Sequence, residues 1–204
     1  SVALAACCMG TMTSCSDFLD ASNKSNVTAK QSFATKEGLN NLVNNAYQHL
    51  QNVYAAPLFT SCFSAGTDMY ADARNKMNEA LNTYETLTPE NTDIKNLYTY
   101  LYSGIRAANS VSYYAQTAQV DDKTKGQLVG EARVLAAYEY YLLVNNFGGV
   151  PIMKDFLTTA DTGYPKSSAA DVYAYIISEL EDVISKNVLQ ASTATKGGGR
   201  ISQE

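Results

Sequence analysis

The stretch that most constrains the fold is a long apolar segment over residues 130–152, which reads GEARVLAAYEYYLLVNNFGGVPI. From Ala132 to Val144, apolar side chains lie on nearly every side of the helix that this spacing predicts. The Gly-Gly pair that follows can close a helix, and Pro151 prevents it from restarting in register. A helix that is apolar all round is stable only when other elements surround it, so we expect this one to lie inside a helical bundle.

Two charged residues near the start of this helix, Glu131 and Arg133, interrupt its apolar surface. We interpret them as a partly buried pair that anchors the helix to its neighbours. A catalytic role for Glu131 would require a second carboxylate or a base placed close by, and the sequence offers no marker for one. We therefore assign no catalytic residue and do not expect an enzyme.

Three further helices can be predicted from capping residues and apolar spacing. The first follows Thr35, with apolar residues at helical spacing from Leu39 to Val53 and His49 on its polar side. The second covers residues 93–115, and Asp121 or Asp122 can cap the central helix. The last follows Ser168, which forms a capping box with the acid three residues later. No strand pattern of useful length is present, so the sequence predicts an all-α fold.

The segment from residue 54 to residue 91 has little periodicity, apart from a short apolar face with Met77, Ala80, Leu81 and Tyr84. A connection of this length is uncommon in a compact domain unless it has a function or is disordered. Its mixture of aromatic and polar residues argues against disorder. The segment therefore supplies our candidate ligand-binding residues: Asp68, Tyr70, Asp72, Arg74, Asn75 and Tyr84.

The amino-terminal residues have the pattern of an export signal. Residues 1–14 are uncharged and contain a short apolar run, which is too brief to span a bilayer. Cys15 follows small residues and is itself followed by Ser-Asp, which resembles the lipobox of bacterial lipoproteins. We expect a signal-peptide remnant over 1–14 and a lipidated Cys15 with a polar tether over 15–34. The alternative interpretation is an N-terminal core helix, which Gly10 and Thr11 disfavour.

Charge and metal-ligating residues exclude several kinds of partner. The net charge is -5 and no basic run is present, which argues against nucleic acid. His49 is the only histidine, and Cys62 is the only cysteine beyond the lipobox, where we expect it to be a small buried side chain. The sequence therefore argues against a zinc site built on histidine and cysteine, and we expect no metal or cofactor.

The central segment resembles the signature of SusD/RagB-like outer-membrane nutrient-binding lipoproteins. In that family the pattern runs Gly-Glu-Ala-Arg, an aromatic residue and Leu-Arg-Ala, and it ends in Phe-Gly-x-Val-Pro-Leu. The stretch from Tyr102 to Asn109 also fits the family's Tyr-x-x-Ile-x-x-x-Asn, whereas Ala136 replaces a usual Arg. The resemblance implies a tetratricopeptide-like helical scaffold with long irregular loops over residues 35–204. In the family a Gly-Arg pair precedes a further helix, so we expect a helix to begin at Arg200 and the domain to be truncated.

The resemblance also implies a function. It predicts a surface-exposed, lipid-anchored outer-membrane protein that binds glycans or oligosaccharides and delivers them to a SusC-like TonB-dependent transporter. The 15 tyrosines and the absence of tryptophan make tyrosine the main stacking group for sugar rings. Most tyrosines are nevertheless expected to pack between helices, in particular Tyr47, Tyr98, Tyr138 and Tyr173. The alternative is a protein- or peptide-binding scaffold of the transporter without sugar binding, and a lipid-anchored glycoside hydrolase is a third class.

Overall fold

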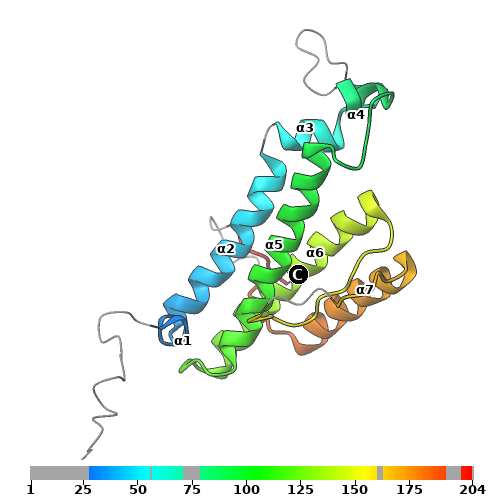
Figure 1. The fold of residues 1–204 in the computed structure, drawn as a ribbon. Coiled ribbons are helices and arrows are strands. Elements are labelled where there is room, and N and C mark those ends of the chain that lie inside the picture. Colours follow the sequence, from blue (N-terminus) through cyan, green and yellow to red (C-terminus); the bar gives the residue numbers. More distant parts are fainter. Residues whose placement is uncertain (1–27, 56, 71–78, 160–162, 192–198, 204) are drawn as a thin grey trace, which may run out of the picture.

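The computed structural model describes residues 28–55, 57–70, 79–159, 163–191 and 199–203 (Figure 1). The helices of this part are α1 (Ala29–Ser32), α2 (Lys36–Tyr54), α3 (Leu58–Phe63), α4 (Glu79–Thr83), α5 (Thr92–Ala115), α6 (Asp122–Phe147) and α7 (Ala169–Lys186). Outside the helices, the same residues form only a single β-bridge, between Ala191 and Gln203. The predicted all-α fold is confirmed. A helix with the length and hydropathy needed to cross a bilayer is absent from the described ranges.

The long helices begin at the predicted capping residues. The Thr35 hydroxyl accepts a hydrogen bond from the backbone N–H of Gly38 at 3.1 Å, and an Asp121 carboxylate oxygen accepts one from Thr124 at 2.9 Å. Ser168 begins α7 with the expected capping box. These side chains satisfy backbone donors that have no partner inside the helix, which explains why each helix begins where it does.

The helices pack as two adjoining pairs. Helix α5 packs against α2 and against α6, while α7 covers α6 (Figure 1). This is the tetratricopeptide-like arrangement that the family resemblance implied. One core cluster includes Leu39, Val43 and Val111 with Leu135, and a second surrounds Tyr140 at the other end of α6. Helix α6 contributes to both clusters, as expected for a helix that is apolar on nearly every side.

Glu131 and Arg133 anchor α6 as predicted, but each has its own partners. The Glu131 side chain is 1% exposed, and one of its oxygens accepts a hydrogen bond from Arg200 Nε at 2.7 Å. Arg133 donates to Glu179 at 2.6 Å and also pairs with Asp182, both on α7. Glu131 therefore fixes the 199–203 segment to α6, and Arg133 fixes α7.

One prediction about local structure is wrong. Residues 199–203 are not helical, because the backbone N–H of Ile201 donates to the Tyr47 hydroxyl at 2.8 Å and that of Gln203 donates to Gln190 O at 2.8 Å. These bonds hold the segment extended against other elements. Most of the tether predicted over 15–34 lies outside the described residues, and its described part contains the one-turn helix α1, which a Thr28–Gln31 capping box begins.

Candidate functional site

Of the residues proposed from the sequence, Asp68, Tyr70 and Tyr84 lie near α3 and α4, at one end of the described fold (Figure 1). Asp68 is exposed, Tyr70 is half-buried, and Tyr84 is 58% exposed with its hydroxyl 3.5 Å from the Gly66 carbonyl oxygen. Tyr84 has a φ of 63°, a left-handed conformation that is uncommon outside glycine. The other candidates, Asp72, Arg74 and Asn75, lie outside the described residues. The structure does not test whether these six residues form one site.

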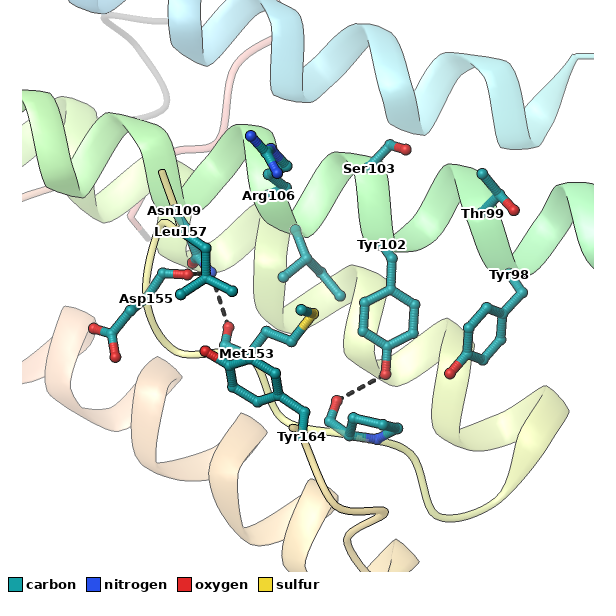
Figure 2. Close-up of a pocket in the computed structure, with 12 residues that line it drawn as sticks. Tyr98, Thr99, Tyr102, Ser103, Arg106, Asn109, Met153, Asp155, Leu157 and Tyr164 are labelled. Atoms are coloured by element: carbon teal, nitrogen blue, oxygen red, sulfur yellow. Dashed lines mark hydrogen bonds between the residues drawn. The ribbon is translucent and has the colours of Figure 1, made fainter. Parts of the chain in front are cut away.

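A cleft of about 520 Å³ lies elsewhere, between α5 and the segment that follows α6 (Figure 2). We call it the α5 cleft. Its lining residues come from two parts of the chain: Tyr98, Thr99, Tyr102, Ser103, Ile105, Arg106 and Asn109 from α5, and Pro151, Met153, Asp155, Leu157 and Tyr164 from the following segment. A volume of this size is in the range of small-molecule binding sites in proteins.

Hydrogen bonds made by the two sequence motifs, the one over residues 102–109 and the one over residues 130–152, hold this cleft together. Tyr102 and Asn109 are seven residues apart, or about two helical turns, so they lie on one face of α5. The Tyr102 hydroxyl donates to Pro151 O at 2.7 Å, and the Asn109 amide donates to Met153 O at 2.8 Å (Figure 2). From α6, the Tyr140 hydroxyl accepts a hydrogen bond from Met153 N at 2.7 Å. These three side chains therefore hold the backbone of residues 151–153 in position.

Aromatic rings form one wall of the α5 cleft. The Tyr98 ring lies 4.8 Å from Tyr102 and 5.1 Å from Phe147, centroid to centroid. Burial is the main cause that raises the pKa of Tyr102, so its phenol stays protonated and remains a hydrogen-bond donor at physiological pH. This wall is aromatic and neutral, which suits contact with the apolar face of a ligand.

Several polar groups at the cleft remain available to a ligand. Arg106 has no acidic partner among the described residues, and its guanidinium carbon lies 5.2 Å from the centre of the Phe156 ring. Ser103 adds a hydroxyl group and Asp155 adds an exposed carboxylate, whereas the Thr99 hydroxyl already donates to Lys95 O at 2.8 Å. Flat rings beside hydroxyl, carboxylate and guanidinium groups can stack on the C–H face of a sugar and pair with its hydroxyls.

Metal chemistry has no support in the described ranges, where no three His, Cys, Asp or Glu side chains are placed to hold an ion. Cys62 is half-buried, and its thiol points to the Asp93 carbonyl oxygen at 3.6 Å. Burial raises the pKa of this thiol to about 11, so it is protonated and unreactive near neutral pH.

The predictions for single aromatic residues and for His49 had mixed outcomes. Tyr47 and Tyr98 pack between elements as expected, although Tyr98 also lines the α5 cleft. Tyr138 and Tyr173 are each 39% exposed, and their hydroxyls bond to Tyr54 on α2 and to Asn145 on α6, so each bridges two helices with its hydroxyl at the edge. His49 was expected on a polar face, but its Nδ1 atom is buried between α2 and α5.

The sequence did not identify the α5 cleft as a site. Tyr102 and Asn109 were marked only as motif residues, and their spacing indicated a shared helix face but not the segment that they bind. Asp155 and Tyr164 lie in an irregular stretch with no periodic signal. Their position depends on hydrogen bonds between residues more than 40 apart in the chain, such as Asn109 and Met153.

Comparison with known proteins gives a family match, a related sequence and several related structures. A SusD-like family model, described as starch-binding and associating with the outer membrane, matches residues 17–194. A SusD-like protein P38 from Formosa agariphila is 28% identical over 190 residues, which cover 91% of this chain and 36% of that protein.

Solved structures give the same relationship. Surface glycan-binding protein A from Bacteroides uniformis superposes with a TM-score of 0.69 at 26% identity, over 82% of this chain and 39% of that one. The protein of that name from Bacteroides thetaiotaomicron, solved in complex with laminarihexaose, gives a TM-score of 0.65 at 22% identity, over 82% of this chain and 36% of that one. This chain thus spans less than two fifths of the length of these relatives.

Proposed function

Because the chain belongs to the SusD-like family, we propose that it binds glycans or oligosaccharides at the cell surface and delivers them to a TonB-dependent outer-membrane transporter. The family match covers residues 17–194, and two of the similar solved structures are named as surface glycan-binding proteins. The proposal includes an anchor in the outer membrane through a lipidated Cys15, and a binding role without catalysis.

The observation that carries the proposal is the composition of the α5 cleft. Tyr98 and Tyr164 supply rings, while Arg106 and Asp155 supply a donor and an acceptor within one cavity of about 520 Å³. Aromatic faces combined with a few directional polar groups are what a neutral, hydroxyl-rich ligand requires. The motif residues Tyr102 and Asn109 support the cleft through their hydrogen bonds to the 151–153 backbone.

We retain Asp68, Tyr70, Asp72, Arg74, Asn75 and Tyr84 as proposed ligand contacts, and those of them that the structure describes do not line the α5 cleft. Tyr84 supports this, since its ring is 58% exposed on a backbone held in a left-handed conformation. Strained, exposed residues of this kind occur often at binding sites. Their contribution is separate from that of the α5 cleft and is tested separately.

The proposal can be tested by isothermal titration calorimetry against a glycan panel and a peptide panel. Glycan binding is expected, and replacing Asp155 with Asn or Tyr164 with Ala should weaken it by roughly two- to tenfold, the usual worth of one hydrogen bond or ring contact. Asp122→Asn, an exposed acid at the start of α6, is the matched control. Binding to peptides and to no glycan would instead establish the alternative, a peptide-binding partner of the transporter.

A further inference from the structure

A second cleft, of about 350 Å³, lies on the other side of α5, between α5 and α2. We call it the α2 cleft. The residues that matter for its chemistry are Asn45 and His49 from α2, Ser103, Arg106 and Tyr114 from α5, and Phe156 from the segment after α6.

The α5 cleft and the α2 cleft adjoin at Ser103 and Arg106, which line both of them. Figure 2 shows how α5 divides them: Tyr98 and Tyr102 project towards the segment after α6, whereas Ser103 and Arg106 project towards the side of α2. A ligand that leaves the α5 cleft past Arg106 therefore enters the α2 cleft.

The α2 cleft offers the same kinds of groups as the α5 cleft. Its aromatic part is a cluster in which Tyr114 lies 4.9 Å from Phe33 and 5.8 Å from Phe156, centroid to centroid. Asn45 is exposed and makes no side-chain hydrogen bond with the described residues, so both its donor and its acceptor are available. Rings and an amide side chain are again suited to a sugar residue.

His49 adds an imidazole ring to the lining of the α2 cleft. Its Nδ1 atom is buried without a hydrogen-bond partner among the described residues, so the ring faces the cleft with its remaining atoms. Burial also lowers the pKa of His49, which keeps the imidazole neutral at physiological pH and leaves one ring nitrogen as an acceptor.

We propose that the α2 cleft binds the sugar residues that extend beyond the α5 cleft, so that the ligand is a linear oligosaccharide that crosses α5 over Arg106. This inference rests on the proposed function, since it assumes that the α5 cleft binds glycan. Arg106 occupies the crossing point, and its guanidinium is free to donate hydrogen bonds to hydroxyls on either side. A monosaccharide or disaccharide would occupy one cleft only.

The test is the dependence of affinity on chain length, measured by calorimetry with maltooligosaccharides and laminarioligosaccharides from disaccharide to hexasaccharide. The wild type should bind the long members more tightly than the short ones. Asn45→Ala and His49→Ala should each weaken binding of the long members by roughly two- to tenfold. Both variants should bind the disaccharide as tightly as the wild type does. Asp155→Asn should weaken binding at every length. Gln51→Ala, at an exposed position of α2 that lines neither cleft, is the matched control and should bind as the wild type does.

The outcomes separate this inference from the proposed function. Affinity that does not rise with length, or that rises equally in Asn45→Ala and His49→Ala, overturns the α2 cleft as a second subsite and leaves glycan binding intact. Absence of binding to every member of a broad glycan panel overturns the proposed function itself. Asn45→Ala replaces an exposed helical residue by the best helix former, so misfolding does not account for a loss.

Discussion

The replacement of Glu139 by Gln is expected to change how the stability of the protein depends on pH. Glu139 lies on α6 with a side chain that is 0% exposed, and neither carboxyl oxygen has a hydrogen-bond partner among the described residues. It is accommodated because its neighbour on α5 is Gly104, where a Cβ atom would lie 1.7 Å from Oε1. An unpaired charge in such a place is costly, so burial raises the pKa of Glu139 well above its ordinary value of 4.5.

The sign of the effect follows from linkage. Below the ordinary pKa, both the folded and the unfolded chain carry the proton, and the full stability is present. As the pH rises above 4.5, the unfolded chain ionises while folded Glu139 stays protonated, so the free energy of unfolding falls until the raised pKa is reached. Over that window one proton is worth about 1.4 kcal/mol for each pH unit. Glu139→Gln removes this dependence and should be the more stable protein at neutral pH.

The assay is urea unfolding followed by far-UV circular dichroism at about pH 5, 6 and 7 for the wild type, Glu139→Gln and Glu181→Gln. The control replaces an exposed carboxylate on α7. The difference in unfolding free energy between Glu139→Gln and the wild type should grow with pH by up to about 1.4 kcal/mol per unit. A difference that is constant over this range, or one that Glu181→Gln reproduces, would refute the reasoning.

Three further predictions concern the core, the 199–203 segment and the anchor. Leu135→Ala should lower the free energy of unfolding by roughly 2 to 5 kcal/mol, because this side chain is 2% exposed in a packed cluster, and a loss below about 1 kcal/mol in denaturant unfolding would contradict its central position. Arg200→Ala should lower the free energy of unfolding by about 3 kcal/mol, which is near the lower end for a buried pair because Arg200 is a quarter exposed. In a double-mutant cycle, adding Glu131→Gln should recover much of that lost free energy. Additive costs would show that the pair is not coupled. Metabolic labelling with a fatty-acid analogue should mark the wild type and not Cys15→Ala, and equal labelling would exclude lipidation at this residue.

Much of the helical fold could be predicted because its signals are local. Thr35, Asp121 and Ser168 accept backbone hydrogen bonds within the next three residues, so a cap can be recognised from neighbouring letters. The apolar character of α6 on nearly every side correctly indicated that other helices surround it.

Long-range contacts explain what the sequence did not predict. The extended state of residues 199–203 depends on Tyr47 and Gln190, and nothing near Arg200 signals either partner. Glu139 belongs to the apolar face by its spacing, yet only the structure shows that Gly104 makes room for it. His49 likewise stands among polar neighbours on α2, whereas its Nδ1 atom is buried against α5.

The candidate site was missed for the same reason. The sequence directed attention to the irregular segment around Asp68 and Tyr84, because aromatic and polar residues are mixed there without periodicity. The α5 cleft instead combines one face of a regular helix with a loop some 50 residues later, and Tyr102 with Pro151 is the contact that joins them. A helix face with tyrosines at this spacing is more often core than site, and here Tyr98 and Tyr102 pack against the core and also line the cleft.

The most direct test of the central claim is to locate the bound glycan. Backbone amide NMR spectra of the chain, recorded during titration with the glycan that binds most tightly, identify the residues that it contacts. The account predicts that amide signals of residues 98–109 and 151–164 shift together and saturate with the calorimetric affinity. Shifts confined to the segment around Tyr84 would assign binding to the residues proposed from the sequence and contradict the α5 cleft, and a spectrum that no glycan changes would contradict glycan binding by this chain.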